Sequence, residues 1–239
     1  AAMETGDLTY AAYSCNSPIT LDLQAGAPLA ALQRDSEAAL AFVQKLKFGL
    51  MIDVVTAQLQ LIRSLRGMTR ELGSLEDGAI TEEGLEQRLA GDPPFVAFLY
   101  WLQKLQALLL AGDHAGAVAA SAKARPLMSS MPSFPETAEY IFYAALACAA
   151  HHDEVAEAER PALCEQIAAH HAQIAAWAEH GPDNFRCRAE LIGAELARIR
   201  GEVDQAARCY EQAIRAARVS GFVQIEAIGY EVAARFHRG

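Results

Sequence analysis

The sequence lacks the features of secreted, disulfide-stabilised and membrane-spanning proteins. Its five cysteines are dispersed and form no CxxC pair, which is typical of reduced thiols in a cytosolic chain. No signal peptide is visible. The most apolar run, residues 95–111, is shorter than the about 20 residues of a membrane span and is interrupted by Lys104 and two glutamines. We therefore expect a cytoplasmic protein in which this run is a buried helix.

Positive charge is also scarce. The chain has 20 Lys and Arg against 30 Asp and Glu, so its formal net charge is −10. An acidic chain repels the phosphates of DNA and RNA, and we expect no nucleic-acid partner. Arg63, Arg66 and Arg70 form a short basic stripe. We interpret this stripe as a solvated helix face with favourable helix-end electrostatics rather than as a phosphate site.

No complete metal site can be assembled from the histidines and cysteines. The pairs His151-His152 and His170-His171 are adjacent in sequence, and adjacent side chains on a helix point about 100° apart. Cys148 shares a helix face with His152, but two ligands do not make a zinc site, which needs four, or three and a water molecule. We expect no metal and no cofactor.

Two pairs of carboxylates are candidates for general acid–base catalysis, namely Glu190 with Glu195 and Glu136 with Glu139. The sequence specifies no apolar, concave surrounding for either pair, which general acid–base catalysis would need. No phosphate-binding loop ending in Gly-Lys-Ser or Gly-Lys-Thr is present. We therefore expect no catalytic residue in this chain.

The residues that are abundant predict an all-α fold. Apolar residues make up 52% of the chain and charged residues 21%, so a core can form. Alanine is frequent, β-branched runs are few, and glycine and proline separate the periodic segments. Helical spacing of apolar residues predicts helices. Besides a stretch of three helices over 184–236 and a helix after each of the glycine turns at Gly6 and Gly112, the expected helices are 27–47, 50–66, 82–89, 95–110, 136–150 and 160–180.

The best-patterned stretch, 184–236, has the arrangement of a tetratricopeptide-type (TPR) hairpin. Gly201 opens a turn, Ala206 and Ala213 allow close helix packing, and Tyr210 fills the space between them. Similar turns stand at Gly6 and Gly112, but the intervals of 106 and 89 residues are not multiples of the about 34-residue repeat. The predicted repeat-packing residues are Gly6, Ala11, Trp101, Gly112, Ala117, Ala124, Gly201, Ala206, Tyr210 and Ala213.

These patterns predict a single domain over 1–239 built of degenerate TPR-like antiparallel hairpins, an α-solenoid of about ten helices. Residues 67–93 interrupt the rhythm with glycines and acidic side chains, and we expect them to form an irregular insertion over the outside of the hairpins. Thr81 is placed to cap the short helix within it. Pro18 is expected to end or kink the first helix.

Five segments carry a family resemblance: 6–14, 134–140, 177–179, 184–185 and 210–215. They resemble the helical-repeat region of very large bacterial and fungal signalling proteins of two-component type. Those proteins join a serine/threonine kinase-like domain, an AAA-type ATPase, a GAF domain and a histidine kinase. The resemblance implies a non-catalytic scaffold or relay segment, with the enzyme chemistry outside these residues. It also implies a protein or peptide partner, or neighbouring domains of the same chain.

The apolar residues of the last expected helix predict an interface. This helix presents an apolar band, and burial of each large side chain contributes about 1.5–3 kcal/mol, so we expect the band to be covered. The helix pattern begins and ends within hairpins, so we expect a fragment of a longer chain. We expect a second copy, in a homodimer, to cover the band, or the helix to be loosely held. The band consists of Phe222, Ile225, Ile228, Val232 and Phe236.

A different function class also fits the predicted fold. A free-standing TPR-type adaptor, or the effector-sensing domain of a transcriptional regulator, would have the same helical periodicity. Such a sensor would hold a small ligand inside the superhelix.

Overall fold

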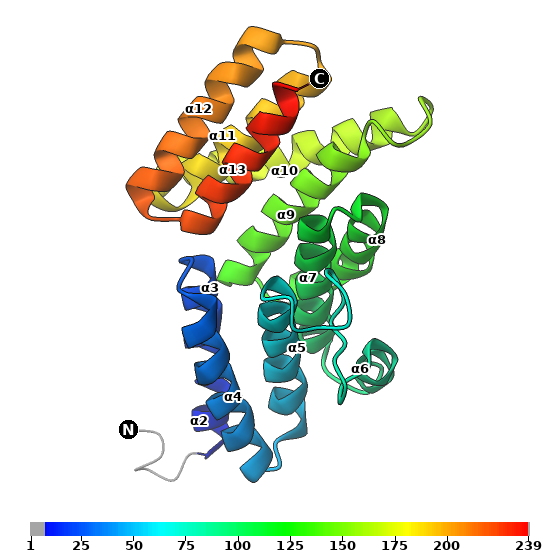
Figure 1. Ribbon diagram of the computed structural model, residues 1–239, viewed down its shortest axis with the longest axis vertical. Helices are drawn as coiled ribbons and strands as arrows, with labels where there is room; N and C mark the ends of the chain where they lie inside the picture. Colours follow the sequence, from blue (N-terminus) through cyan, green and yellow to red (C-terminus); the bar gives the residue numbers. More distant parts are fainter. Residues whose placement is uncertain (1–7, 239) are drawn as a thin grey trace. The chain divides into compact units, whose positions relative to one another are not determined.

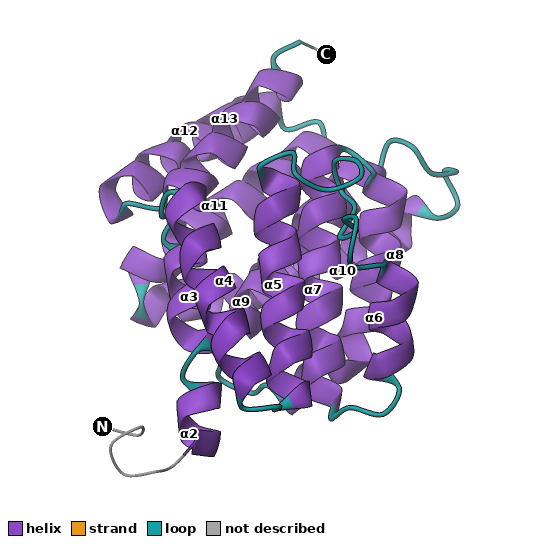
Figure 2. Cartoon of the chain, turned by 60° about the horizontal axis from the view of Figure 1, so that its bottom comes forward, coloured by secondary structure: helices purple, strands orange, loops and turns teal. Residues whose placement is uncertain are grey.

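The computed structural model describes residues 8–238, and this part of the chain is all-α, as predicted, with no strand (Figures 1 and 2). Contacts divide the chain into two compact units, residues 1–137 and 138–239. Helix α9 (Pro135–His151) begins in the first unit and continues into the second. The continuous solenoid and the single domain over 1–239 stay predictions.

Unit 1 is built of helical hairpins. Helices α4 and α5 form one packed pair, α7 and α8 form another, and α5 packs on α7 between them. Short connections favour such antiparallel neighbours. The elements of unit 1 before α9 are α2 (Leu8–Tyr13), α3 (Asn16–Gln24), α4 (Leu29–Lys45), α5 (Gly49–Leu65), α6 (Glu82–Leu89), α7 (Pro94–Ala111), α8 (His114–Ala124) and the 3-10 helix η1 (Arg125–Ser130).

Helix α7 is the most apolar element. By length and composition alone it could cross a membrane, a test that the core helices of soluble proteins also pass. Half of it, 50%, is buried in the fold. Leu102 and Leu105 are among its buried residues, which agrees with a helix at the centre of unit 1.

The effect of Pro18 differs from the expectation. The first described helix already ends at Tyr13, and Pro18 lies in the first turn of the next helix, α3. Backbone N–H groups in a first turn have no partner within the helix, so proline costs nothing there. The correction is that Pro18 starts a helix that sequence periodicity missed.

The 67–93 insertion packs against α5 and α7 and contributes to a buried cluster of unit 1. Its helix α6 has the predicted bounds, and the Thr81 hydroxyl accepts a hydrogen bond from the Gly84 amide at 3.2 Å. Leu75 and Leu85 are buried in one cluster with side chains of α5 and α7, including Tyr100. Glu82 Oε1 accepts from the Leu75 amide at 2.7 Å. The insertion is therefore fixed by both apolar and polar contacts.

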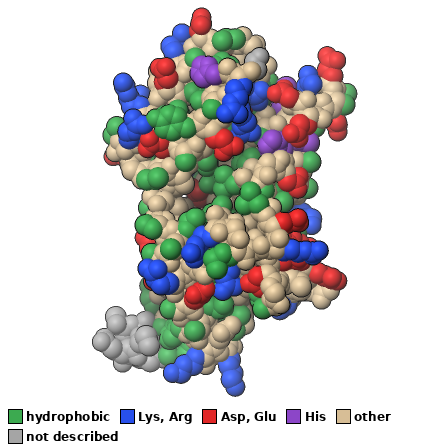
Figure 3. Space-filling view, viewed as in Figure 1, with side chains coloured by type: hydrophobic (Ala, Val, Ile, Leu, Met, Phe, Trp, Pro, Cys, Tyr) green, Lys and Arg blue, Asp and Glu red, His purple; other side chains and the backbone are tan. Residues whose placement is uncertain are grey.

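The basic stripe is paired within the fold, and it is solvated only in part: Arg66 and Arg70 are exposed as expected, whereas Arg63 is partly buried. Arg63 bonds Asp77 at 2.7 Å and Glu37 at 3.0 Å, and its side chain is only 25% exposed. Arg66 donates to Gln33, and Arg70 lies 3.5 Å from Glu76. On the face shown in Figure 3, basic and acidic side chains are intermixed.

Unit 2 continues α9 with four more helices. Each packs on the next, and α13 also contacts α11. Gly201 and Gly221 end two of the helices with φ of 74° and 78°, a left-handed conformation that glycine adopts without strain. The four helices are α10 (Arg160–His180), α11 (Pro182–Ile199), α12 (Val203–Ser220) and α13 (Val223–Phe236).

The apolar band of α13 is covered within the chain. Ile225 is 2% exposed, and Ile228 and Val232 are each 8% exposed. Phe236 stacks on Tyr210 with ring centroids 5.3 Å apart, and Phe222 lies under a guanidinium. The expectation that this band lacks a covering helix is wrong, because α11 as well as α12 packs against α13.

Candidate functional site

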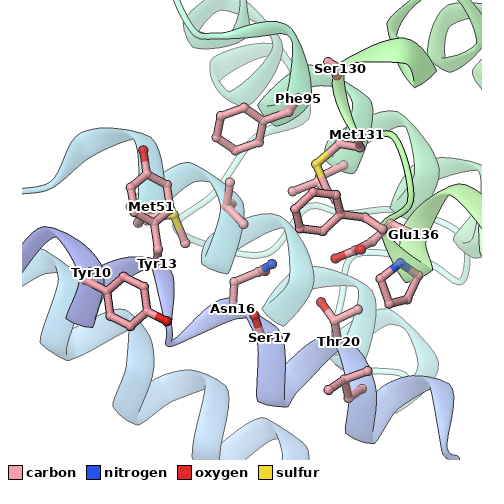
Figure 4. A pocket seen from close by; sticks show the side chains of 15 residues that line it. Tyr10, Tyr13, Asn16, Ser17, Thr20, Met51, Phe95, Ser130, Met131 and Glu136 are labelled. Carbon is pink, nitrogen blue, oxygen red and sulfur yellow. The ribbon is translucent and has the colours of Figure 1, made fainter. Parts of the chain in front are cut away.

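Unit 1 contains a cavity of about 720 Å³, which we call the chamber (Figure 4). Four parts of the unit line it: α2 with α3, α5, α7, and the segment from η1 into α9. Ten of its fifteen lining residues are apolar or aromatic, including Tyr10, Tyr13, Phe95 and Phe134. The volume falls in the range of about 300–1,000 Å³ that small-molecule sites occupy.

The polar side of the chamber carries Asn16, Thr20 and Glu136. The carboxamide oxygen of Asn16 is buried and accepts no hydrogen bond from the described residues. Glu136 is 6% exposed, and Figure 4 shows its carboxylate and the amide nitrogen of Asn16 turned toward the same space. Thr20 is 7% exposed, and its hydroxyl accepts a hydrogen bond from Gln58 Nε2 at 2.8 Å. None of the described residues that line the chamber is Lys, Arg or His.

Local sequence explains how Glu136 comes to the chamber wall. Pro135 is the first residue of α9, a position that suits proline. The acidic side chain that follows lies in the first turn, where the helix dipole favours a negative charge. Thr137 Oγ1 donates to the Met131 carbonyl at 2.6 Å and fixes the turn that leads into the helix. Asn16, on the facing side, is the first residue of α3.

A second concave surface, which we call the groove, lies in unit 2 between α10, α11 and α12. Its volume is about 530 Å³. Small residues such as Ala175, Ala189 and Gly193 line it together with charged side chains of both signs. These charged residues are Glu179, Arg186, Glu190 and Arg200.

Burial favours the neutral forms of two groove side chains, His171 and Cys209. Burial lowers the pKa of His171, against the opposing charge of Glu190. A Cβ at Gly193 would come within 3.2 Å of His171 Nε2, so the glycine lets the ring lie close to α11. Burial raises the pKa of the Cys209 thiol. A thiol with a raised pKa is a poor nucleophile, which favours a packing role.

The predicted repeat-packing residues that the structure describes lie in helix interfaces and turns, outside both concave surfaces. Gly112 and Gly201 are left-handed, with φ of 83° and 74°. Trp101 is partly buried, with Lys123 Nζ 3.8 Å from its ring centroid, and Gly6 lies outside the described residues. The others are almost fully buried: Ala11, Ala117, Ala124, Ala206, Tyr210 and Ala213. Their shared role as repeat-packing residues stays a prediction.

The carboxylates that could be drawn as acid–base pairs are directed to different places. Glu136 lines the chamber, whereas Glu139 bonds Arg188 within unit 2. Glu190 lines the groove, whereas Glu195 accepts a hydrogen bond from Tyr210. The structure therefore gives neither pair a shared site.

Two adjacent histidines, His151 and His152, each pair with a nearby acidic group. His151 lies 2.8 Å from Glu154, and His152 lies 2.8 Å from Asp153. Residues 8–238 contain no group of three or more His, Cys, Asp and Glu side chains placed to hold a metal ion.

Neither concave surface is indicated by a sequence motif. Asn16, Ser17 and Thr20 belong to no recognisable motif, and in the sequence Glu136 stands out only as half of an acid–base pair. The one signal at the chamber is the Phe134-Pro135-Glu136 helix start, which places an acidic group beside an exposed aromatic ring.

Comparisons with known proteins give no relative from which to transfer a function. No family model matches the chain. No curated protein matches it, and neither does any solved structure. The residues and their geometry therefore carry the functional argument.

Proposed function

We propose that the chain is a non-catalytic helical-repeat segment that binds a peptide, or an extended segment of a neighbouring domain, in the groove of unit 2. In this proposal it serves as a cytoplasmic scaffold or relay segment of a multidomain signal-transduction kinase. The proposal rests on the groove, which is lined by small and charged side chains. Buried polar pairs hold the helices that form it in place.

The first buried pair joins two helices of unit 2 and lies beside the start of a third. Arg188 on α11 donates to Glu139 on α9 at 2.5 Å, and the two side chains are 5% and 6% exposed. The guanidinium also donates to the Asn184 carbonyl at 2.6 Å and lies 4.7 Å from the Phe222 ring centroid. Arg188 thus ties α9 and α11 to the residue that precedes α13.

The second polar group fixes α12, one wall of the groove. Tyr210 donates to Glu195 on α11, and Arg198 bonds the same carboxylate at 2.9 Å. Arg198 also bonds Asp153 at 2.8 Å and the Ala149 carbonyl at 2.8 Å. A surface held in its bound conformation loses less entropy on binding, so these contacts support recognition.

The chemistry of the groove suits an extended peptide with side chains of both signs. Alanines and Gly193 leave room for a backbone to approach the helices closely. Arg186 and Arg200 offer partners for acidic side chains, and Glu179 and Glu190 for basic ones. Such rim charges set orientation and association rate more than affinity.

The test is to select peptides from a random library on the immobilised full chain and to measure their affinity by calorimetry. Ala178→Trp fills the groove, and we expect it to weaken the selected peptides at least about tenfold, as hot-spot changes do. Arg200→Glu should change their charge preference. Arg215→Glu makes the same charge change on an exposed residue of α12 outside the groove and should leave binding unchanged.

Selected peptides that bind the Ala178→Trp variant as tightly as the unmodified chain would disprove the groove as the binding site. We also expect the chain not to bind ATP, because the sequence has no phosphate-binding loop. Saturable micromolar binding of ATP–magnesium by the full chain would contradict it.

A further inference from the structure

We propose that the chamber of unit 1 binds a neutral aromatic molecule that carries a hydrogen-bond acceptor, such as a ketone oxygen. The chamber lies in unit 1 and the groove in unit 2, so the inference stands independently of the proposed peptide binding. It rests on the apolar walls and mouth of the chamber, on the lack of a partner for an ion among the described lining residues, and on an amide donor turned into the space.

The walls of the chamber suit an aromatic body. Met51, Val54 and Leu99 present apolar surface to a cavity of about 720 Å³. Figure 4 shows Tyr13 on one side of this space and Phe95 on another. Aromatic rings and thioethers contact apolar and aromatic groups favourably, and a cavity of this volume is large enough for a drug-sized ligand. The chamber is thus suited to a body of two rings rather than to a sugar or a polar chain.

Exposed apolar side chains gather at the same place. Eleven large hydrophobic residues are exposed in the described part of the chain, and four of them line the chamber: Tyr10, Tyr13, Leu21 and Phe134. Each of the four is at least 41% exposed. Exposed apolar residues that lie together mark a binding surface, whereas single ones need no explanation. A bound aromatic molecule would cover part of this surface, and the same exposure gives the molecule a route into the cavity.

The chamber has no partner for a charged ligand. No Lys, Arg or His is among the described lining residues, so an anion would be buried there without a counter-charge. The one acidic lining residue, Glu136, is 6% exposed and already interacts with another group of the chain. Burying an unpaired ion costs far more free energy than burying a neutral polar group. We therefore expect an uncharged ligand.

One polar side chain specifies an acceptor on that ligand. Figure 4 shows the amide nitrogen of Asn16 turned toward the chamber, and its N–H groups donate to none of the described residues. A donor that loses its water on ligand binding needs a new acceptor, or free energy is lost. A ketone or ether oxygen on the aromatic body would accept this hydrogen bond. A pure hydrocarbon would fill the chamber and leave the Asn16 amide without a partner.

A fluorescent ketone tests the inference on the full chain. Prodan, 6-propionyl-2-(dimethylamino)naphthalene, is neutral, and its emission responds to the polarity of its surroundings. A fixed low concentration of prodan is titrated with the chain at pH 7, and naphthalenes that differ in one substituent then compete with it. We expect saturable binding of prodan and its displacement by 2-acetylnaphthalene. The charged analogues 2-naphthoate and 2-naphthylmethylammonium should compete at least about tenfold less well. No saturable binding of prodan, or equal competition by the ketone and either ion, would overturn the inference.

Two variants locate the site. Asn16→Leu keeps the approximate size of the side chain and removes the donor. We expect it to lower the affinity for 2-acetylnaphthalene relative to 2-ethylnaphthalene by about two- to tenfold, as the loss of one neutral hydrogen bond implies. The hydrocarbon in this ratio corrects for changes in apolar contact. Asn184→Leu makes the same change at the other asparagine of the chain, outside the chamber, and should leave the ratio unchanged.

The second variant, Ser17→Trp, places a large ring at an exposed lining position and should weaken prodan binding at least about tenfold. Circular dichroism checks that each variant is folded. An unchanged ratio of ketone to hydrocarbon affinity in Asn16→Leu would refute the role of the amide donor and with it the proposal. Undiminished prodan binding by folded Ser17→Trp protein would place the ligand outside the chamber and refute the proposal as well.

Discussion

Arg188 Nη2 donates a 2.5 Å hydrogen bond to Glu139 Oε1 across 49 residues of sequence, and both side chains are almost fully buried. Removing one partner leaves the other as a buried charge. We therefore predict that Arg188→Ala lowers the free energy of unfolding by about 3–5 kcal/mol. Urea unfolding followed by circular dichroism measures the change.

The matched control for this pair replaces both partners. In Arg188→Met/Glu139→Leu no charge is left buried, so we expect the double variant to be more stable than Arg188→Ala alone. A double variant that loses as much stability as the two single changes together would show that the ion pair is not what makes the site sensitive.

Tyr210 contributes both a large buried ring and a hydrogen bond to Glu195. We predict that Tyr210→Ala costs about 3–5 kcal/mol, whereas Tyr210→Phe, which removes only the hydroxyl, costs about 1–2 kcal/mol. Ala206→Leu should cost about 1–3 kcal/mol by overpacking the same interface. Tyr230 is 51% exposed, and Tyr230→Ala is the surface control, expected within about 0.5 kcal/mol of the unmodified chain. Denaturant midpoints that are alike for all four variants would contradict this account.

The regular parts of the fold were predictable because their information is local. The spacing of Ala206, Tyr210 and Ala213 placed the buried face of α12, and Thr81 marked the start of α6. A helix period or a cap can be recognised within a few residues. Helix bounds were therefore close to those observed, apart from the missed α3 and η1.

The concave surfaces and the buried polar pairs were not predictable because they depend on which helices meet. Asn16 and Glu136 face one chamber although 120 residues separate them in the chain. The same reason explains the error at α13. Its apolar band is covered by α11, and nothing in the sequence of α13 indicates that a helix two elements earlier returns to it.

Acid should loosen unit 1 through Asp77. Burial by itself raises the pKa of the Asp77 carboxyl, but hydrogen bonds from the Gln60 side chain and two backbone amides, with the Arg63 charge, outweigh it and lower the pKa. A carboxyl with a lowered pKa in the folded state stabilises the fold above its unfolded pKa of about 3.9. That stabilisation is lost as the pH falls through the folded pKa. We predict a smaller acid-induced loss of stability for Asp77→Asn, measured by urea unfolding from pH 7 down to pH 3.

Asp92 provides a control of opposite sign. Burial, and then the Asp53 charge, raises the pKa of Asp92 in the folded protein. Its ionised form therefore opposes folding at neutral pH, and this effect disappears as the pH falls below the unfolded pKa. Asp92→Asn should be as stable as the unmodified chain at pH 7 or slightly more stable. The same pH response for the Asp77→Asn and Asp92→Asn variants would contradict these assignments.

Two left-handed glycines should respond differently to the same substitution. Gly73 has φ of 86°, and a Cβ there would lie 2.8 Å from the Cβ of Ala111, whereas Gly112, with φ of 83°, has open space around it. Gly112→Ala should cost about 1–2 kcal/mol from backbone strain alone. Gly73→Ala adds a clash between the insertion and α7 and should cost more. Equal midpoints in urea unfolding would mean that the insertion can shift away from α7 without loss.

Helix α13 should be protected without a second copy of the chain. Ile225, Ile228 and Val232 are buried, and α13 packs on both α11 and α12. Slow amide exchange follows from burial and packing, so we predict that the amides of α13 exchange on the same timescale as those of α12. Hydrogen–deuterium exchange by mass spectrometry measures this at two protein concentrations. Ile225→Asp introduces a charge among buried groups and should make α13 exchange faster while α4 and α5 in unit 1 are unchanged. Protection of the α13 amides only at the higher protein concentration would contradict this prediction. It would show that association of two copies, rather than packing on α11 and α12, protects the helix.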